Sequence, residues 1–290
     1  MIETAQAYLD AGISVLPAIA AQKRPAVAEW KPYQQRRPTA AEVRAWFSNG
    51  HSALCLVCGS ASGNLEMLDF DAGGELFESW RETVRTMAAE LLERLVIERT
   101  PSGGYHVAYR SETEICGNLK LAQRRLADNK IATLIETRGE GGLFLCAPSP
   151  GYELIQGDFS GLPILTTEER DILLSAAWAL NEYVPATEPI PVSGANLARP
   201  GDDYNARGDV RSVLTKHGWI LARAGENEYW RRPGKTAGWS ATLKDRVFFV
   251  FSANAAPFEQ HKAYAPFACL LYTSDAADDL LCVDLGGRRI

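Results

Sequence analysis

The run Met67-Leu68-Asp69-Phe70-Asp71 constrains the fold most, because it sets two carboxylates into an apolar segment. A strand places alternate side chains on one face, so Asp69 and Asp71 lie together while Phe70 points into a core. Two neighbouring carboxylates repel each other unless water or a divalent cation such as Mg²⁺ or Mn²⁺ compensates their charge. The run therefore predicts a strand with a candidate metal site. Glycosyltransferases, nucleases and ordinary surface strands can carry the same D-x-D pattern.

A glycine turn joins two strand-like runs at residues 95–100 and 105–109. Gly103 and Gly104 can take positive φ angles and let backbone N–H groups approach an anionic ligand closely. His106 follows the turn, and the alternation of its neighbours predicts an imidazole on a half-open surface. The alternative is an ordinary hairpin whose histidine is satisfied by a backbone carbonyl.

A third strand-like run, residues 132–136, ends in Glu136, and Arg138 and several glycines follow it. On its own, Glu136 is typical of a surface acid at the end of a strand. The Cys55-x-x-Cys58 pair has no second Cys or His pair at the spacing of a zinc ribbon. We therefore expect these cysteines to lie on a buried strand without metal.

Taken in order, these elements resemble the bifunctional primase-polymerase domain of the archaeo-eukaryotic primase superfamily, which is found mostly in plasmid, phage and prophage replication proteins. The resemblance covers about the first 180 residues. It is carried by residues 11–17, Lys23-Arg24-Pro25, Trp30, Trp46-Phe47, Gly59, Asp69, Asp71, residues 100–106, Lys120-Leu121-Ala122, residues 135–142, Ala147-Pro148-Ser149 and Tyr152. The family commonly has two prolines before the serine where this chain has Ala147-Pro148, a difference that should alter a loop.

The resemblance implies nucleotidyl transfer with Mg²⁺ or Mn²⁺. The family acids that match Asp69, Asp71 and Glu136 hold the divalent ions, and the histidine that matches His106 contacts the phosphates of the incoming nucleotide. A two-metal site needs carboxylates from different strands and cationic or N–H donors for a triphosphate. Our candidates for the phosphate side are Arg138, Lys120 and the Ser102-Gly103-Gly104 turn, although Lys120 could equally be a solvated lysine.

The expected fold is α/β (α+β), with a mixed or antiparallel sheet in the catalytic domain. The expected partners are a DNA template or primer and (d)NTPs, and a helicase domain or protein C-terminal to the chain is one further candidate. A non-catalytic replication-initiation or DNA-binding module with the same fold is the alternative function. Intact acids at all three positions argue against that alternative.

Composition agrees with a globular protein of more than one domain. The chain has 290 residues, of which 46% are hydrophobic, enough to fill a sizeable core. It has no apolar run long enough to span a bilayer and no secretion signal, so we expect a cytoplasmic protein without membrane contact. The net charge of −6 argues against a broad coat of nucleic acid, so a template should contact a local groove.

Four segments are expected: a catalytic domain at 1–182, a linker at 183–200, a small α+β module at 201–268 and a tail at 269–290. The linker is rich in proline and has no apolar period. The module holds ten Lys or Arg against seven Asp or Glu, with aromatic residues among them. That composition suits contact with single-stranded nucleic acid, and a small core capped by solvated charges is equally compatible with it.

The tail differs in origin. Residues 269–278 and 283–290 match translations of the two ends of a transposon-end adapter used in sequencing libraries. We therefore expect 269–290 to be non-native and poorly packed.

Overall fold

The chain divides into two units, Met1–Tyr183 and Val184–Ile290. The structure is a computed structural model that describes residues 1–183, 200–236, 238–252, 254–259 and 262–273. The division lies at the start of the segment expected to be a linker, and residues 184–199 of that segment are outside the described residues. No helix among the described residues is long and apolar enough to cross a membrane.

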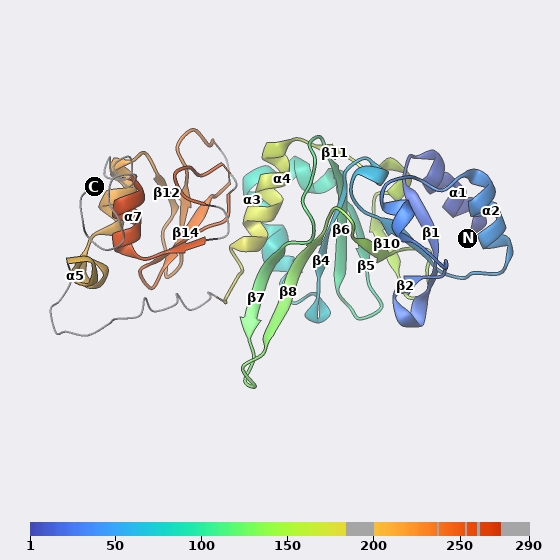
Figure 1. Ribbon diagram of the computed structural model, residues 1–290, viewed down its shortest axis with the longest axis horizontal. Coiled ribbons are helices and arrows are strands. Elements are labelled where there is room, and N and C mark those ends of the chain that lie inside the picture. Colours follow the sequence, from blue (N-terminus) through green and yellow to red (C-terminus); the bar gives the residue numbers. More distant parts are fainter. Residues whose placement is uncertain (184–199, 237, 253, 260–261, 274–290) are drawn as a thin grey trace, which may run out of the picture. The chain divides into compact units, whose positions relative to one another are not determined.

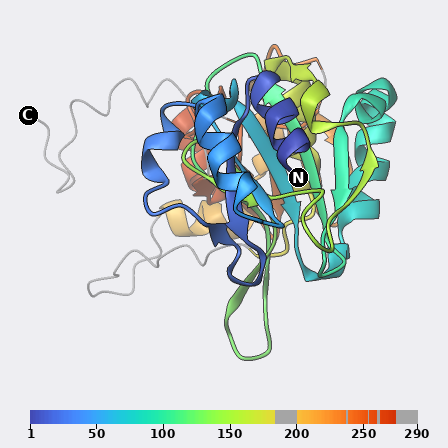
Figure 2. The same ribbon diagram turned by 90° about the vertical axis from the view of Figure 1, so that its right-hand side faces the viewer.

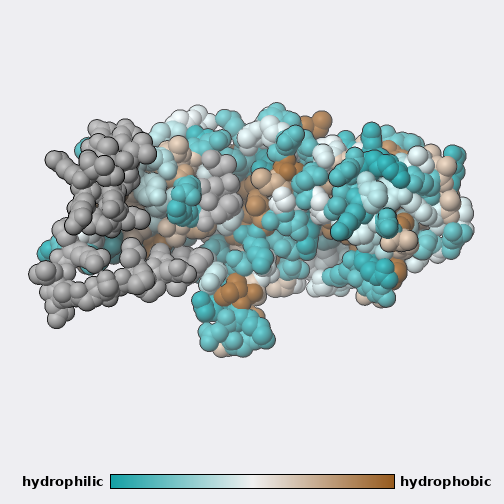
Figure 3. All heavy atoms as spheres, viewed as in Figure 1, coloured by the Kyte–Doolittle hydropathy of each residue, from teal (hydrophilic) through white to brown (hydrophobic). Residues whose placement is uncertain are grey.

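The first unit is built around a large, almost entirely antiparallel sheet (Figure 1). Among the described strands, only β11 (Ile164–Leu165) pairs in parallel, with the end of β6. The remaining strands lie in the order β10 (Glu153–Gln156), β5 (Val96–Arg99), β6 (Tyr105–Ser111), β4 (Leu65–Phe70), β8 (Ile131–Arg138) and β7 (Lys120–Arg125). The candidate metal strand β4 is therefore central, and the β7–β8 hairpin extends well beyond the rest of the sheet (Figure 1, and as spheres in Figure 3).

A smaller antiparallel sheet packs against one face of the large sheet, in the order β2 (Arg24–Pro25), β1 (Ser14–Ile19), β3 (Leu54–Val57) and β9 (Leu143–Leu145). Helices α1 (Ile2–Asp10) and α2 (Ala40–Ser48) lie side by side on this part of the unit (Figure 2). Their apolar side chains join one core with both sheets, including Val15 and Leu56 of the small sheet and Met67 of β4. Short 3₁₀ helices cover residues 20–22, 31–34, 60–62, 72–74 and 159–161.

Local sequence signals explain where α2 begins. The hydroxyl of Thr39 accepts the backbone N–H of Glu42, and the Glu42 carboxylate accepts the backbone N–H of Thr39. This reciprocal pair satisfies N–H groups that the first turn of a helix leaves without partners. Thr39 and Glu42, three residues apart, therefore form a capping box that fixes the start of α2.

Helices α3 (Phe77–Arg94) and α4 (Thr167–Trp178) cover the other face of the large sheet. Trp80 of α3 is fully buried, packs edge-on against Phe70 of β4, and donates its indole N–H to the carbonyl of Leu173 in α4. The predicted inward direction of Phe70 is thus confirmed, because the strand turns Phe70 away from Asp69.

A polar network also anchors α4 to the large sheet. Glu66 of β4 is completely buried, and its carboxylate accepts two hydrogen bonds from Arg170 of α4 and one from the hydroxyl of Tyr109. Burial and the adjacent Glu66 carboxylate raise the pKa of Tyr109 well above its usual value. The hydroxyl therefore stays a hydrogen-bond donor.

The second unit has its own antiparallel sheet, with strands β12 to β16 in sequence order. Trp230, Leu243 and Phe248 come from the sheet and form a core with Leu214 of the preceding helix. The elements are α5 (Pro200–Arg207), α6 (Val210–Lys216), β12 (Ile220–Arg223), β13 (Glu228–Arg231), β14 (Ala241–Lys244), β15 (Val247–Val250), β16 (Lys262–Tyr264) and α7 (Pro266–Thr273).

The expectation that the tail is poorly packed is wrong for its first five residues, 269–273. Helix α7 continues past Ala268 to Thr273, and Cys269 is completely buried in the core of the second unit. The ring of Tyr272 also stacks on Phe258. An apolar run will pack wherever a helix can present it to an open core, whatever its origin. The rest of the tail, 274–290, lies outside the described residues.

Candidate active site

Strand register brings five ionisable residues into one row across the large sheet. Glu98 of β5 is paired with His106 of β6, and His106 is paired with Asp69 of β4. Asp69 is paired in turn with Glu136 of β8, and Glu136 with Lys120 of β7. Residues paired directly across neighbouring strands point to the same face. Segments up to 67 positions apart in the chain, from Asp69 to Glu136, therefore supply one continuous surface.

Three carboxylates meet at the centre of this row. Asp69, Asp71 and Glu136 each offer an oxygen, and these oxygens all lie within 4.8 Å of one another. Burial raises the pKa of Asp71, and the nearby Asp69 charge adds to the rise. Burial likewise raises the pKa of Glu136, with further contributions from Asp69 and Asp71. The cluster thus holds uncompensated negative charge, which a bound divalent cation would neutralise.

Arg138 partly compensates the cluster. One of its terminal nitrogens lies 2.6 Å from the Glu136 carboxylate and 3.4 Å from that of Asp69. About a third of the Arg138 side chain is exposed, so the guanidinium can also reach a ligand in solvent. The sequence-predicted Arg138 therefore lies beside the acids, as a phosphate-binding residue next to a metal site would.

His106 lies deeper than expected. It is only 6% exposed, so the prediction of a half-open surface is wrong, because the small sheet and the segment after it pack over this end of β6. Its ring packs edge-on against Phe144 and lies near Tyr152. The Nδ1 atom is 2.7 Å from Glu98 Oε1, and the Nε2 atom is 3.7 Å from Asp69 Oδ1.

A cleft of about 610 Å³ opens beside these residues. The acids Asp69 and Asp71 line it together with His106 and Arg138. The opposite wall comes from the small sheet and its connections, and it adds two cations and several aromatic rings: Lys23, Arg24, Trp30, Phe144 and Tyr152. A cleft with acids at one side and cations around them can hold a metal-bound polyanion.

The glycine turn lies next to the acids, but its residues and Lys120 are not among those that line the cleft. Gly104 sits where a Cβ atom would be 2.2 Å from the carbonyl oxygen of Phe70, and Gly103 has a φ of +86°. The glycines are therefore required for a tight hairpin against β4. Lys120 is exposed and is paired with Glu136 across the sheet edge.

Sequence reasoning missed Glu98 and Asn118. Asn118 lines the cleft, and its side-chain oxygen accepts the backbone N–H of Gly139. Glu98 stands opposite His106 across the hairpin. The sequence does hold a signal for Glu98. In an antiparallel hairpin in which Arg99 pairs with Tyr105, the preceding residue Glu98 must pair with the following residue His106. No comparable signal identifies Asn118, which lies between strands.

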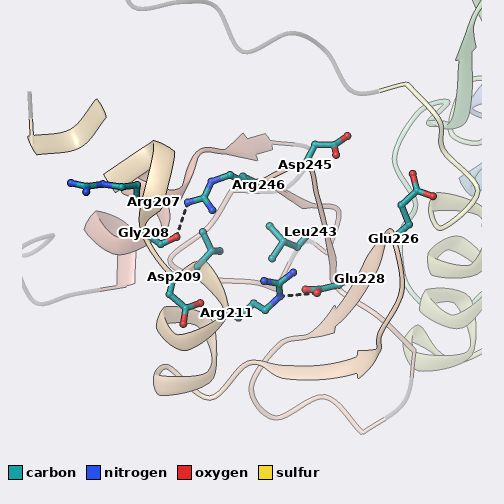
Figure 4. Close-up of a pocket in the computed structure, with 10 residues that line it drawn as sticks. Arg207, Gly208, Asp209, Arg211, Glu226, Glu228, Leu243, Asp245 and Arg246 are labelled. Carbon is teal, nitrogen blue, oxygen red and sulfur yellow. Dashed lines mark hydrogen bonds and ion pairs between the residues drawn. The ribbon is translucent and has the colours of Figure 1, made fainter. Parts of the chain in front are cut away.

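The second unit has a smaller polar pocket of about 290 Å³ (Figure 4). Arg211 donates to Glu228 at 2.7 Å, and Arg246 donates to the carbonyl of Gly208, which follows α5 (Figure 4). Arg246 also donates to the carbonyl of Asn205 in α5. These basic residues are thus engaged with protein acceptors. The excess of basic residues in the sequence of this unit does not by itself create a free cationic surface here.

Comparison with known proteins points to the same region of the chain. The family model for the bifunctional DNA primase/polymerase, N-terminal, matches residues 5–165. This range includes both sheets and all the residues that line the cleft. A comparison with curated proteins finds no match.

Proposed function

Because the chain belongs to the bifunctional DNA primase/polymerase, N-terminal, family, we propose that its first unit catalyses template-directed nucleotidyl transfer at the Asp69-Asp71-Glu136 cluster. Family membership suggests DNA primase or polymerase activity, and DNA and nucleotides are substrates that fit the family. We further propose a setting in mobile-element or phage replication, with a helicase as a partner.

The donor set suits two divalent cations. Carboxylate oxygens are the ligands that Mg²⁺ and Mn²⁺ prefer, and three of them lie within 4.8 Å here. The raised pKa values of Asp71 and Glu136 support the fit, since a bound cation would favour the charged forms that burial and, to a smaller extent, the neighbouring acids disfavour. When bound, such ions stabilise the negative charge on the attacking 3′ hydroxyl oxygen and on the departing pyrophosphate.

Basic side chains of the protein and His106 can contact the remaining phosphates of the nucleotide. His106 and Arg138 flank the acids, and Lys23 and Arg24 line the facing wall of the cleft. A triphosphate held between these groups would lie with its reacting phosphorus next to the carboxylate cluster. The aromatic ring of Trp30 in the same wall offers a surface for a base.

One observation carries this proposal: register pairs Asp69 with both His106 and Glu136, so these three side chains share one face, and Asp69, Asp71 and His106 line one cleft. Primer extension with Mg²⁺ or Mn²⁺ tests it, using Asp69→Asn in the full chain. We expect transfer to fall by at least about 10²–10³-fold. Asp10→Asn is the matched control, because Asp10 is an exposed acid that bonds only Gln6 among the described residues.

Activity retained in Asp69→Asn would contradict the metal assignment. A folded wild-type chain that binds nucleotide and DNA but extends no primer under either metal would instead favour a non-catalytic replication module.

A further inference from the structure

Glu98, on β5, stands at one end of the row of five ionisable residues and takes no part in the metal cluster. Its side chain is completely buried. Burial raises the pKa of Glu98, and the hydrogen bond with His106 opposes that rise. A buried carboxylate is costly unless hydrogen bonds compensate it. The partners of Glu98 therefore indicate what the protein gains from keeping an acid at this depth.

Each oxygen of Glu98 faces one hydrogen-bond donor. Oε1 lies 2.7 Å from Nδ1 of His106, and Oε2 accepts the backbone N–H of Ala147 at 2.8 Å. A carboxylate only accepts hydrogen bonds, so Nδ1 of His106 carries the hydrogen of this contact. Ala147 follows β9 of the small sheet. One side chain thus ties the histidine of the large sheet to the opposite wall of the cleft.

The ring of His106 is fixed from several sides. Phe144 packs edge-on at 5.4 Å between ring centroids, and Tyr152 lies at 5.8 Å. With Nδ1 held from behind, Nε2 is the ring atom on the side of Asp69. Its 3.7 Å separation from the Asp69 carboxylate is too long for a hydrogen bond. Nε2 is therefore positioned for a ligand in the cleft that His106 lines.

We propose that Glu98 is a positioning residue for nucleotidyl transfer: it accepts the Nδ1–H of His106 and so keeps the ring turned with Nε2 toward the cleft, where Nε2–H donates to the phosphates of the incoming nucleotide. The proposal rests on the function proposed for the cleft. Carboxylates that orient a metal-ligating histidine through its second nitrogen contribute about 10- to 100-fold to the affinity or activity of their site, and we expect an effect of the same order where the histidine contacts a phosphate.

The same sheet provides a matched control. Glu66 is also a completely buried carboxylate with three hydrogen bonds, but its partners are Arg170 and Tyr109 on the face covered by α4. Removing the charge of Glu66 disturbs the packing of α4 and leaves His106 untouched. Glu66→Gln therefore reports the effect of altering a buried acid without altering the proposed orientation.

Calorimetric titration of a non-hydrolysable dNTP into the full chain, with Mn²⁺ present, tests the proposal. Glutamine offers one oxygen to two donors, so we expect Glu98→Gln to lower nucleotide affinity by about 10- to 100-fold. Mn²⁺ affinity without nucleotide should remain at the wild-type value, since Glu98 does not touch the cluster. In Glu66→Gln, the folded fraction should bind nucleotide as the wild type does.

A second measurement needs no variant of Glu98. Nitrogen-15 NMR of the wild-type chain, with the His106 signals assigned through His106→Ala, should show a hydrogen on Nδ1 in the free protein and hydrogens on both ring nitrogens when the nucleotide is bound, since Nε2 needs one to donate to a phosphate. A ring without a hydrogen on Nδ1 would overturn the proposal, as would wild-type nucleotide affinity in folded Glu98→Gln, or equal losses in Glu98→Gln and Glu66→Gln. Both measurements report nucleotide binding and the state of the ring, and neither depends on catalysis. If they gave the expected results but the wild-type chain extended no primer, the proposed function would be wrong and the role of Glu98 in binding would stand.

Discussion

The large sheet buries a carboxylate on each face, and the two are compensated in different ways. Glu66 accepts hydrogen bonds from a permanent cation, Arg170, and from Tyr109 beneath α4. Glu98 accepts from an imidazole and a backbone amide at the end of a cleft. The guanidinium of Arg170 uses its hydrogen bonds to anchor α4 to Glu66. The imidazole of His106 binds Glu98 through one nitrogen and keeps the second nitrogen available for a ligand in the cleft. Partners, more than burial, distinguish a structural acid from a functional one.

The two faces also differ in how they meet solvent. The face with Glu66 is covered by α3 and α4, and Trp80 and Phe70 fill the space between them. The face with Glu98 is covered by the small sheet only in part, and the uncovered part is the cleft. Variants on the two faces should therefore separate effects on activity from effects on stability.

The largest effect is expected on the cleft face. Glu136→Gln should lower primer extension by at least about 10²–10³-fold, because it removes a charged oxygen from the cluster. The thermal transition should change little, since the same substitution relieves repulsion from Asp69 and Asp71. Primer extension and a thermal melt of the same sample measure both. A variant that lost stability but kept activity would reverse the comparison between the faces.

The next effect is expected beneath α4. Arg170→Met leaves the buried Glu66 without its cation, and breaking a buried pair in this way costs about 3–5 kcal/mol. Denaturant unfolding measures the loss. The control is Arg94→Met, which breaks an exposed bridge between α3 and α4 and should cost less than about 1 kcal/mol. Similar losses in the two variants would show that the Glu66 site is not a structural anchor.

A smaller effect is expected at His106. His106→Ala should weaken binding of a non-hydrolysable nucleotide by about 10- to 100-fold and leave Mn²⁺ affinity nearly intact, because His106 stands beside the cluster without being a proposed ligand. Titration of each ligand separately decides between these roles. Lost Mn²⁺ binding with unchanged nucleotide affinity would assign His106 to the metal.

The smallest effect is a pH dependence of metal-free stability. The folded-state pKa of Asp71 is raised, so ionisation of this group costs the folded state stability as pH rises through that pKa. Asp71→Asn should therefore be slightly more stable than the wild type at pH 7 in EDTA, by less than about 1 kcal/mol. The difference should vanish below about pH 3, where the wild-type carboxyl is protonated in both states. Thermal melts at the two pH values measure it, and a gain that persists in acid would exclude the charge as its cause.

Local sequence patterns could predict parts of the fold. The alternation around Phe70 predicts which side of β4 meets the core, and the Thr39-x-x-Glu42 spacing predicts the start of α2. These predictions hold because they depend on side chains that are close in sequence. The role of the glycine turn was harder to predict, since a phosphate-binding turn and a tight hairpin need the same residues. The contact of Gly104 with Phe70 shows the hairpin requirement directly.

The amino-acid sequence by itself determined which residue types this chain can use: two acids one residue apart on a strand, a histidine after a glycine turn, and a further acid near an arginine. Only the tertiary structure decided which of them meet. Register across β5, β6, β4 and β8 aligns Glu98, His106, Asp69 and Glu136, and packing of the small sheet buries His106. The physical reason is that pairing of distant strands depends on the whole core, because a slip of one residue would turn every side chain of a strand to the opposite face.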